Sequence, residues 1–206
     1  MRLRLPKSRG KLLASVAVIG AAASIAGLGT YATFTSSTSA SQTISSGTVT
    51  IALGATGAST NRLNIGASNI AAGDTIQRSV DLINQGSLNL SAVTLTTTAT
   101  TSSALNTDPV NGLQMVIDKC SVPWTEGGTA PAYTYTCSGA TSIVLASTPV
   151  VGSNMTLSNL SALTAGSTDH LRVTLTLPVT APNSMQGLTS TIQYTFTGTQ
   201  RAGTNQ

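Results

Sequence analysis

Most of this sequence alternates apolar residues with serine, threonine or other polar residues, one position at a time. The alternation is clearest in "SGTVTIAL" (46–53), "DTIQRSVDLIN" (74–84), "LNLSAVTLTTT" (88–98), "HLRVTLTLPV" (170–179) and "TIQYTFTGT" (191–199). Successive side chains of a β-strand point to opposite faces, so this pattern predicts half-buried antiparallel strands. Clusters of Gly, Asn and Pro separate the segments as turns. We therefore expect an all-β fold, a single jelly-roll-like antiparallel β-sandwich over residues 45–200 with about seven to nine strands, and a short tail at 201–206.

Two local features refine this expectation. The alternation slips by one residue between Leu90 and Val93, which predicts a β-bulge or the join of two strands. The segments "NIAAGDTIQRSVDL" (69–82) and "LSALTAGSTDHLRVTL" (160–175) also resemble each other, because an Ala-Gly step precedes an alternating strand in both. Each Ala-Gly step is expected to be the turn that enters a core strand.

The composition argues against several classes of protein. Only 8% of the residues are charged, and 40% are hydrophobic, which is unlike a disordered chain. The net charge of +4 arises at the N-terminus, where Arg2, Arg4, Lys7, Arg9 and Lys11 supply five of the ten basic residues. The remainder carries a formal charge of 5 − 6 = −1. The basic balance is therefore a targeting feature and does not indicate a nucleic-acid partner.

Residues 1–32 have the three parts of a secretory signal peptide, which is expected to form a helix. Basic residues precede an apolar stretch from Leu12 to Leu28, and small residues follow it. We expect cleavage between Ala32 and Thr33. The alternative is an uncleaved anchor, because Leu12–Leu28 is about as short as a membrane span of ~17–25 residues permits. The protein is expected outside the cell in either case.

The segment that follows the signal peptide, 33–44, is uncharged and contains neither Gly nor Pro. One interpretation is a flexible linker. The other is an extended strand that pairs with a sheet edge, including the edge of another molecule. The residues of this candidate donor strand are Thr33, Phe34, Thr35, Ser36, Ser37, Thr38, Ser39, Ala40, Ser41, Gln42, Thr43 and Ile44.

The chain has two cysteines, Cys120 and Cys137, which in an exported protein are expected to form a disulfide rather than remain free thiols. The sequence between them contains two Pro and a Gly-Gly pair, and this predicts a hairpin with a long loop. It also contains Trp124, the only tryptophan. An exposed Trp124 would give a cell-surface binding or adhesion module its ligand anchor. The alternative is that Trp124 packs over the disulfide or the sandwich.

Residues suited to catalysis are scarce. His170 is the only histidine, so the HExxH pair of zinc peptidases is absent, and no third cysteine completes a thiolate site. His170 and Asp169 are adjacent on an expected strand and would point to opposite faces. We expect His170 to be a surface residue at the edge of a sheet. The sequence predicts no enzyme activity, no catalytic residues, no metal site and no cofactor.

Acidic residues are scattered along the chain. Asp74 and Asp108 lie in turn sequences, where aspartate accepts hydrogen bonds from its own backbone. Asn106, Asp108 and Asn111 together offer oxygens that a calcium ion would need. The turn interpretation is favoured over the calcium site.

Three stretches resemble the TasA/camelysin family of exported bacterial surface proteins. "GTYATF" (29–34) is similar to the family's cleavage junction, and "SSGTVTIAL" (45–53) to its first strand. "NIAAGDTIQRSVDLINQGSLNLSAVTL" (69–95) resembles a block in which Gly73, Asp74, Asn84, Gly86 and Ser87 fall in register. The resemblance covers about residues 20–97, and the segment between the cysteines is not expected from it.

The resemblance implies a jelly-roll protein of the biofilm matrix or cell surface. A SipW-type signal peptidase would cut after Ala32, and the freed segment from Thr33 to about Ile44 would pair as a donor strand with the next subunit. The implied partners are further copies of the chain, joined head to tail, the signal peptidase, and matrix or cell-wall components. The metalloprotease label of the camelysin branch is not transferred, because the chain lacks the residues for it.

Overall fold

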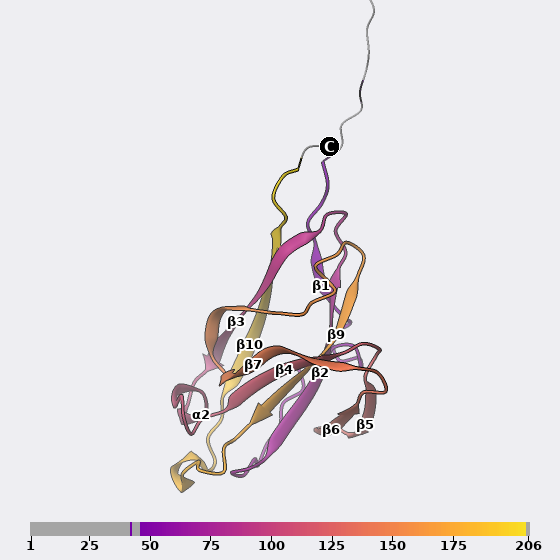
Figure 1. Ribbon diagram of the computed structural model, residues 1–206. Coiled ribbons are helices and arrows are strands. Elements are labelled where there is room, and N and C mark those ends of the chain that lie inside the picture. The colour runs from indigo at the N-terminus through magenta and orange to yellow at the C-terminus, as the bar shows by residue number, and fades with distance from the viewer. Residues whose placement is uncertain (1–41, 43–45, 205–206) are drawn as a thin grey trace, which may run out of the picture. The chain divides into compact units, whose positions relative to one another are not determined.

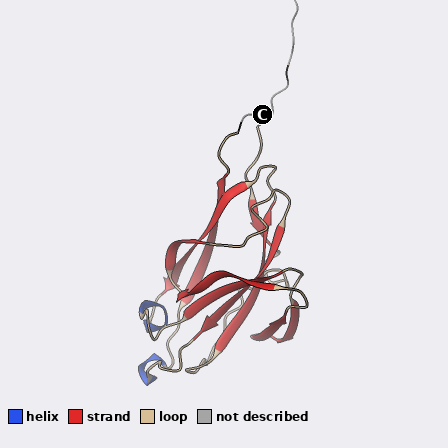
Figure 2. Cartoon of the chain, in the orientation of Figure 1, coloured by secondary structure: helices blue, strands red, loops and turns tan. Residues whose placement is uncertain are grey.

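Ten strands and two single-turn helices make up the regular structure of the residues described, which are residue 42 and residues 46–204 of this computed structural model (Figures 1 and 2). The strands are β1 (Ile51–Leu53), β2 (Thr75–Asn84), β3 (Leu90–Thr101), β4 (Gln114–Cys120), β5 (Thr125–Thr129), β6 (Ala132–Thr136), β7 (Thr141–Pro149), β8 (Gly152–Thr156), β9 (Thr168–Thr176) and β10 (Thr191–Gln200). The helices are α2 (Ala104–Thr107) and the 3₁₀ turn η1 (Asn183–Met185).

The strands form two antiparallel sheets and a separate hairpin. The first sheet has the order β1-β2-β9-β4-β7, and the second has the order β10-β3-β8. Strands β5 and β6 pair only with each other among the described residues. The predicted all-β, antiparallel, sandwich-like fold is confirmed. The described chain has ten strands rather than seven to nine, because the hairpin between the cysteines contributes two that belong to neither sheet.

The core lies between the two sheets and is built from the alternating apolar positions. Its residues come from both layers, so the faces of the sheets that carry them pack against each other. A smaller cluster surrounds α2 and η1, with Leu105, Leu113, Val150, Leu177 and Met185 buried. The main core comprises Val80, Leu82, Leu90, Val93, Leu95, Met115, Ile117, Val144, Leu157, Leu160, Ala162, Leu171 and Val173.

The slip between Leu90 and Val93 is a β-bulge. The register of β3 against β10 shifts there, since Thr199 faces Ala92 while Gln200 faces Leu90. Ser91 is the extra residue, and its hydroxyl donates to the carbonyl oxygens of Thr199 and Gln200 at 3.3 and 3.0 Å. The bulge that the sequence predicts is thus confirmed.

The two Ala-Gly steps do enter core strands. Gly73 and Gly166 have φ angles of +95° and +76°, a region that favours glycine, and they precede β2 and β9. These two strands are antiparallel neighbours in the middle of the first sheet, with Thr75 facing Thr176. The similar segments therefore make equivalent, neighbouring parts of one sheet.

The loop after β2, residues 85–88, holds the segment that leads into β1. Asn84 is fully buried, accepts from the Gly86 amide at 3.0 Å and donates to the Leu88 carbonyl at 3.2 Å. The amides of Gln85 and Ser87 donate to the carbonyls of Thr50 and Thr48. A side chain at Gly86 would meet the Thr48 carbonyl oxygen at 2.5 Å, so only glycine permits this approach. The loop thereby fastens residues 48–50.

The first strand is shorter than the alternation predicts. Residues 46–50 are exposed and β1 comprises only Ile51–Leu53, although the pattern extends back to residue 46. The bonds from the 85–88 loop hold residues 48–50 in place of a strand ladder. The last strand, β10, ends at Gln200, and residues 201–204 have no regular structure.

The expected signal peptide, its cleavage point and the donor segment lie outside the described residues, apart from Gln42, which is exposed. Within the described part of the chain, none of the helices has the length and hydropathy that crossing a membrane requires.

Candidate functional site

An apolar groove lies between the edge strands of the two sheets. Its cavity of about 230 Å³ is lined by Ile51, Ala52, Leu53, Leu82, Tyr194, Thr195 and Phe196, which belong to β1, β2 and β10. A side chain at Gly198 would meet Ile51 at 3.0 Å, so β1 and β10 lie side by side. The two strands do not pair with each other: β1 forms its main-chain hydrogen bonds with β2, and β10 forms its own with β3.

The long strand β10 presents an unpaired edge along this groove. It pairs with β3 from Thr191 to Gln200, and no described strand pairs with its outer edge. Tyr194 and Phe196 point inward toward the core, where burial raises the pKa of Tyr194 to about 12. The groove therefore combines apolar side-chain contacts with a row of main-chain groups that pair with no described strand, and an added strand needs both.

The hairpin between the cysteines packs over the outer face of the first sheet. Cys120 and Cys137 form a disulfide with a Cα–Cα distance of 5.7 Å. Strand β6 contacts β2. Arg62 forms a double ion pair with Glu126, with Nε–Oε2 and Nη2–Oε1 distances of 2.9 and 2.6 Å, and its guanidinium lies 4.8 Å from the Tyr133 ring. These contacts tie the hairpin to the loop before β2.

Electrostatics reinforce this attachment. The hydrogen bonds from Arg62 lower the pKa of Glu126, and the same bonds raise the pKa of Arg62. Tyr135 is buried, donates to Glu126 at 2.9 Å, and has its pKa raised mainly by burial. Arg78 is 5% exposed and donates to the carbonyls of Ile65, Gln77 and Gly66, while burial lowers its pKa.

Trp124 is engaged in the fold. Its indole N–H donates to the His170 carbonyl at 2.9 Å, and the Arg172 guanidinium lies 4.3 Å from its ring. Arg172 in turn forms a double ion pair with Asp118, whose closer contact is 2.6 Å. The structure thus gives Trp124 the packing role that the sequence left open, with one ring face covered by an arginine.

His170 does not lie at a sheet edge, so that prediction is wrong. It belongs to β9, which runs between β2 and β4 in the interior of the first sheet. Its Nδ1 lies 2.7 Å from Asp81 Oδ1, and both side chains are half-buried. The alternating pattern revealed which face His170 occupies, but it carries no information on the order of strands in a sheet.

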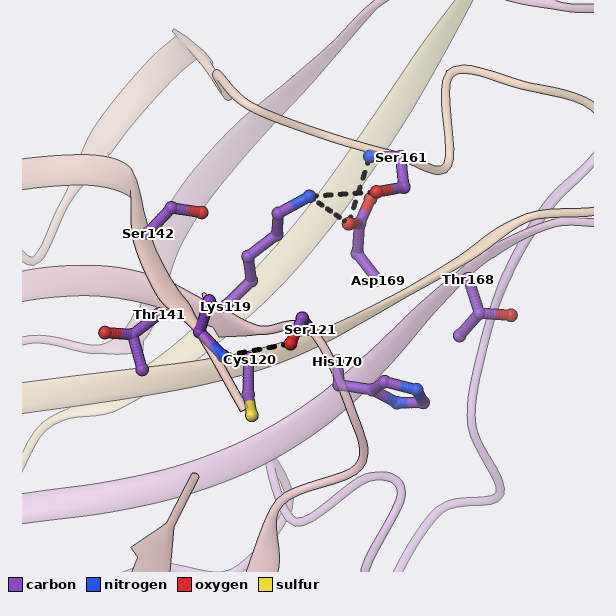
Figure 3. A pocket seen from close by; sticks show the side chains of 10 residues that line it. Lys119, Cys120, Ser121, Thr141, Ser142, Ser161, Thr168, Asp169 and His170 are labelled. Carbon is purple, nitrogen blue, oxygen red and sulfur yellow. Dashed lines mark hydrogen bonds and ion pairs between the residues drawn. The ribbon is translucent and has the colours of Figure 1, made fainter. Parts of the chain in front are cut away.

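Asp169 points to the other face, as predicted. It is 2% exposed and accepts hydrogen bonds from the amides of Ser161 and Ala162. Lys119 donates to Asp169 and to the Ser161 hydroxyl, both at 2.9 Å, and the three lie at the wall of a cavity of about 330 Å³. Figure 3 shows the His170 ring turned away from this group. Lys119 is the donor to both the Asp169 carboxylate and the Ser161 hydroxyl, so it is not arranged as a base for Ser161.

The two turn aspartates behave as predicted. Asp74 accepts from the Ala71 amide at 2.7 Å. Asp108 accepts from the amides of Val110 and Asn111, and these bonds lower its pKa. Asn106 uses its side-chain oxygen to cap α2 and to accept from Ser190. The side-chain oxygens of Asn106 and Asp108 are thus engaged in local hydrogen bonds.

The residues do not fit the metal of a metallopeptidase. A catalytic zinc ion needs about three protein ligands from His, carboxylate or Cys. The one histidine of the sequence contacts the carboxylate of Asp81, and both cysteines are in the disulfide. Residues 46–204 contain no group of three or more His, Cys, Asp or Glu that could hold a metal ion.

The groove residues on β10 were not recognised as a site from the sequence. Tyr194 and Phe196 occupy inward positions of "TIQYTFTGT", and such positions are ordinarily core. The available signal was the concentration of aromatic residues at the inward positions of the last strand. That β10 is an edge strand beside β1 depends on topology, which alternation does not specify.

A comparison with known protein families finds a match for the first part of the chain. The family described as camelysin metallo-endopeptidase matches residues 8–120, more than half of the chain, and the match ends at the first cysteine of the disulfide. The search of curated proteins gave no match. On the extent of the family match, together with the antiparallel sandwich, this chain belongs to the camelysin family.

Proposed function

We propose that this protein is a secreted structural subunit of the cell surface or biofilm matrix, which polymerises when its N-terminal segment completes the groove of another copy. The observation that carries the proposal is the groove itself: the ten-residue strand β10, whose outer edge pairs with no described strand, lies beside the apolar side chains of β1 and Leu82. Family membership supports the extracellular setting.

The segment 33–44 suits this groove in length and chemistry. Twelve extended residues span about 40 Å and the ten residues of β10 about 33 Å, at ~3.3 Å per residue. The segment carries no charge, and its Phe34 and Ile44 are apolar side chains of a kind the groove can bury. Along the chain the segment comes just before residues 48–50, which the 85–88 loop fastens.

Head-to-tail strand donation does not close on itself, so it produces filaments instead of dimers. Signal cleavage at Ala32–Thr33 would control the process, because the uncleaved chain keeps the donor segment next to a membrane-inserted stretch. In this proposal Thr33 to Ile44 and the β1–β10 groove are the functional site, and the partner is a second copy of the chain.

The proposal is tested with a synthetic peptide of residues 33–44 added to the purified, signal-cleaved protein. We expect the peptide to occupy the groove and reduce fibre mass in a dose-dependent manner. A scrambled peptide of the same composition should have no effect. Unchanged assembly at a large molar excess of the native peptide, with fibres present, would argue against groove complementation.

A second test changes the groove. Tyr194→Glu places a charge among apolar groove residues, whereas Thr136→Glu places the same charge on the exposed face of the hairpin. Fibres are expected from the Thr136 variant and not from the Tyr194 variant. Near-ultraviolet circular dichroism verifies that both variants are folded.

The endopeptidase activity in the family's name is not part of the proposal. It is left out because, within residues 46–204, His170 and Asp81 are not joined by a third His, Cys, Asp or Glu that could hold a metal ion. The test is digestion of an unfolded protein substrate with and without a chelator. Proteolysis by the pure protein that the chelator abolishes would refute a purely structural role.

A further inference from the structure

The second sheet has an outer face made almost entirely of threonine. In β3 and β10 the outward positions alternate with the buried ones. Cross-strand pairs place Thr94 opposite Thr197 and Thr96 opposite Thr195, and Thr94 also faces Thr156 of β8. We name this surface the threonine face; it comprises Thr94, Thr96, Thr98, Thr100, Thr156, Thr191, Gln193, Thr195, Thr197 and Thr199.

No charge interrupts the strands of this sheet. The segments "LSAVTLTTTATT", "GSNMT" and "TIQYTFTGTQ" contain no Asp, Glu, Lys, Arg or His, and the nearest charge along the chain is Arg201, after β10. The other sheet, in contrast, carries seven such residues: Arg78, Asp81, Asp118, Lys119, Asp169, His170 and Arg172. The two sheets of the sandwich therefore differ sharply in electrostatic character.

The outer faces of the two sheets also differ in whether other parts of the chain pack over them. The first sheet is covered in part by the disulfide hairpin, through Trp124 over Arg172 and Tyr133 beside Arg62. The described chain places no hairpin or helix over the threonine face, whose members on β10 are all exposed. Soluble proteins ordinarily carry interspersed charges of both signs on their surfaces, and a surface without charge favours association. This face lacks such charges.

We infer that the threonine face is a contact surface for the same face of a second copy of this chain, and that it joins neighbouring fibres side by side. The inference rests on the proposed fibre function. A neutral face does not repel its own copy, and threonine supplies both methyl groups to bury and hydroxyls to pair across the contact. Outward aromatic rings, which would favour a sugar ligand, are missing from the face, since Tyr194 and Phe196 point inward.

The size of the face explains why such contacts act between fibres and not between free subunits. Strands β3, β10 and β8 have 12, 10 and 5 residues, so at ~3.3 Å per residue and a spacing of about 4.8 Å they offer at most roughly 450 Å². Two copies would bury roughly 900 Å² in total, which is less than the ~1,200–2,000 Å² of stable complexes. Repetition along a fibre multiplies the weak contact into a strong one. Single subunits are thus expected to dimerise weakly, and fibres to bundle firmly.

The test uses the signal-cleaved protein and the double variant Thr98→Lys/Thr156→Lys, whose positions lie on β3 and β8 and not on the acceptor strand β10. Both residues are exposed on the face, neither lines the β1–β10 groove, and their side chains make no hydrogen bond described for this structure. The matched control, Thr134→Lys/Thr136→Lys, adds the same charge to exposed hairpin positions. Bundling is measured by low-speed sedimentation, and fibre width by negative-stain electron microscopy.

We expect bundles from the wild type and the control, at low and high salt alike. The face variant should form fibres of single width, with at least a fivefold loss of sedimented mass at low salt and recovery at high salt, where the added charges are screened. Bundling of the face variant equal to that of the wild type at low salt would overturn the inference. So would bundling that occurs only when polysaccharide is added.

Failure of the fibre proposal is distinguishable from failure of this inference. If the wild type forms no fibres, sedimentation velocity at increasing concentration measures the face contact directly. Weak dimers are then expected from the wild type and the hairpin control, and monomers from the face variant. A wild type that stays monomeric to millimolar concentration would contradict the inference.

Discussion

Asn84→Ala tests how the sandwich fastens the start of its first strand. The Asn84 side chain is fully buried and bridges the Gly86 amide and the Leu88 carbonyl. After the substitution the Gly86 amide retains the Thr50 carbonyl at 3.1 Å, but the Leu88 carbonyl loses its side-chain donor. One buried group without its partner costs about 1–3 kcal/mol, so we expect a loss of about 2 kcal/mol in the free energy of unfolding.

The assay is urea unfolding followed by circular dichroism, with a thermal melt beside it. For a domain of this size about 2 kcal/mol corresponds to a decrease of roughly 4–8 °C in Tm. The control is Gln85→Ala in the same loop, where the side chain is exposed and the expected change lies within about 0.5 kcal/mol. Amide hydrogen exchange at Gln85 and Ser87 reports the local effect, because these amides donate to Thr50 and Thr48.

The expected result is faster exchange at both amides together with the loss of stability. A loss below about 0.5 kcal/mol, or unchanged exchange at Gln85 and Ser87, would refute the view that Asn84 organises this loop. Loss of stability without faster exchange would show that Asn84 matters to the core and not to the anchoring of residues 48–50.

Three further predictions concern the hairpin. The pKa of Glu126 is lowered in the folded protein, so its contribution to the free energy of unfolding is complete above the ordinary glutamate pKa and is lost as the pH falls through the lowered value. In urea unfolding, Glu126→Gln should therefore be less stable than the wild type by a constant amount from neutral pH to about 5. This difference in stability should shrink below about pH 4. Replacing Cys120 and Cys137 by serine should lower the free energy of unfolding by about 3 kcal/mol, given their separation of 17 residues, and equal stability of the reduced and oxidised wild type would contradict this. Trp124→Phe keeps an aromatic ring beneath Arg172 but loses the hydrogen bond to the His170 carbonyl. We expect the free energy of unfolding to fall by about 1 kcal/mol in the same assay. An unchanged free energy of unfolding would show that this hydrogen bond does not stabilise the protein.

Features that depend on neighbouring residues could be predicted from the sequence. The slip at Ser91, the turn aspartates at Asp74 and Asp108 and the Ala-Gly entries at Gly73 and Gly166 all follow from side-chain alternation or turn chemistry. The face of each strand follows from the same alternation, and this is why Asp169 and His170 were placed on opposite sides.

Features that depend on strand order could not be predicted. Arg62 and Glu126 are 64 residues apart, and their ion pair exists only because the hairpin folds back over the first sheet. His170 was placed at an edge because alternation says nothing of which strands flank β9. The β1–β10 groove likewise needs the first and last strands to be neighbours, a property of topology that short patterns do not encode.

We propose that residues 33–44 complete the groove of another copy. The most direct test of this proposal is negative-stain electron microscopy of purified residues 33–206 beside a protein that begins near Ser45. We expect fibres from the first and dispersed particles from the second, with both showing the same circular dichroism spectrum of a folded β-protein. Fibres from the shortened protein, or dispersed particles from both at high concentration, would contradict it.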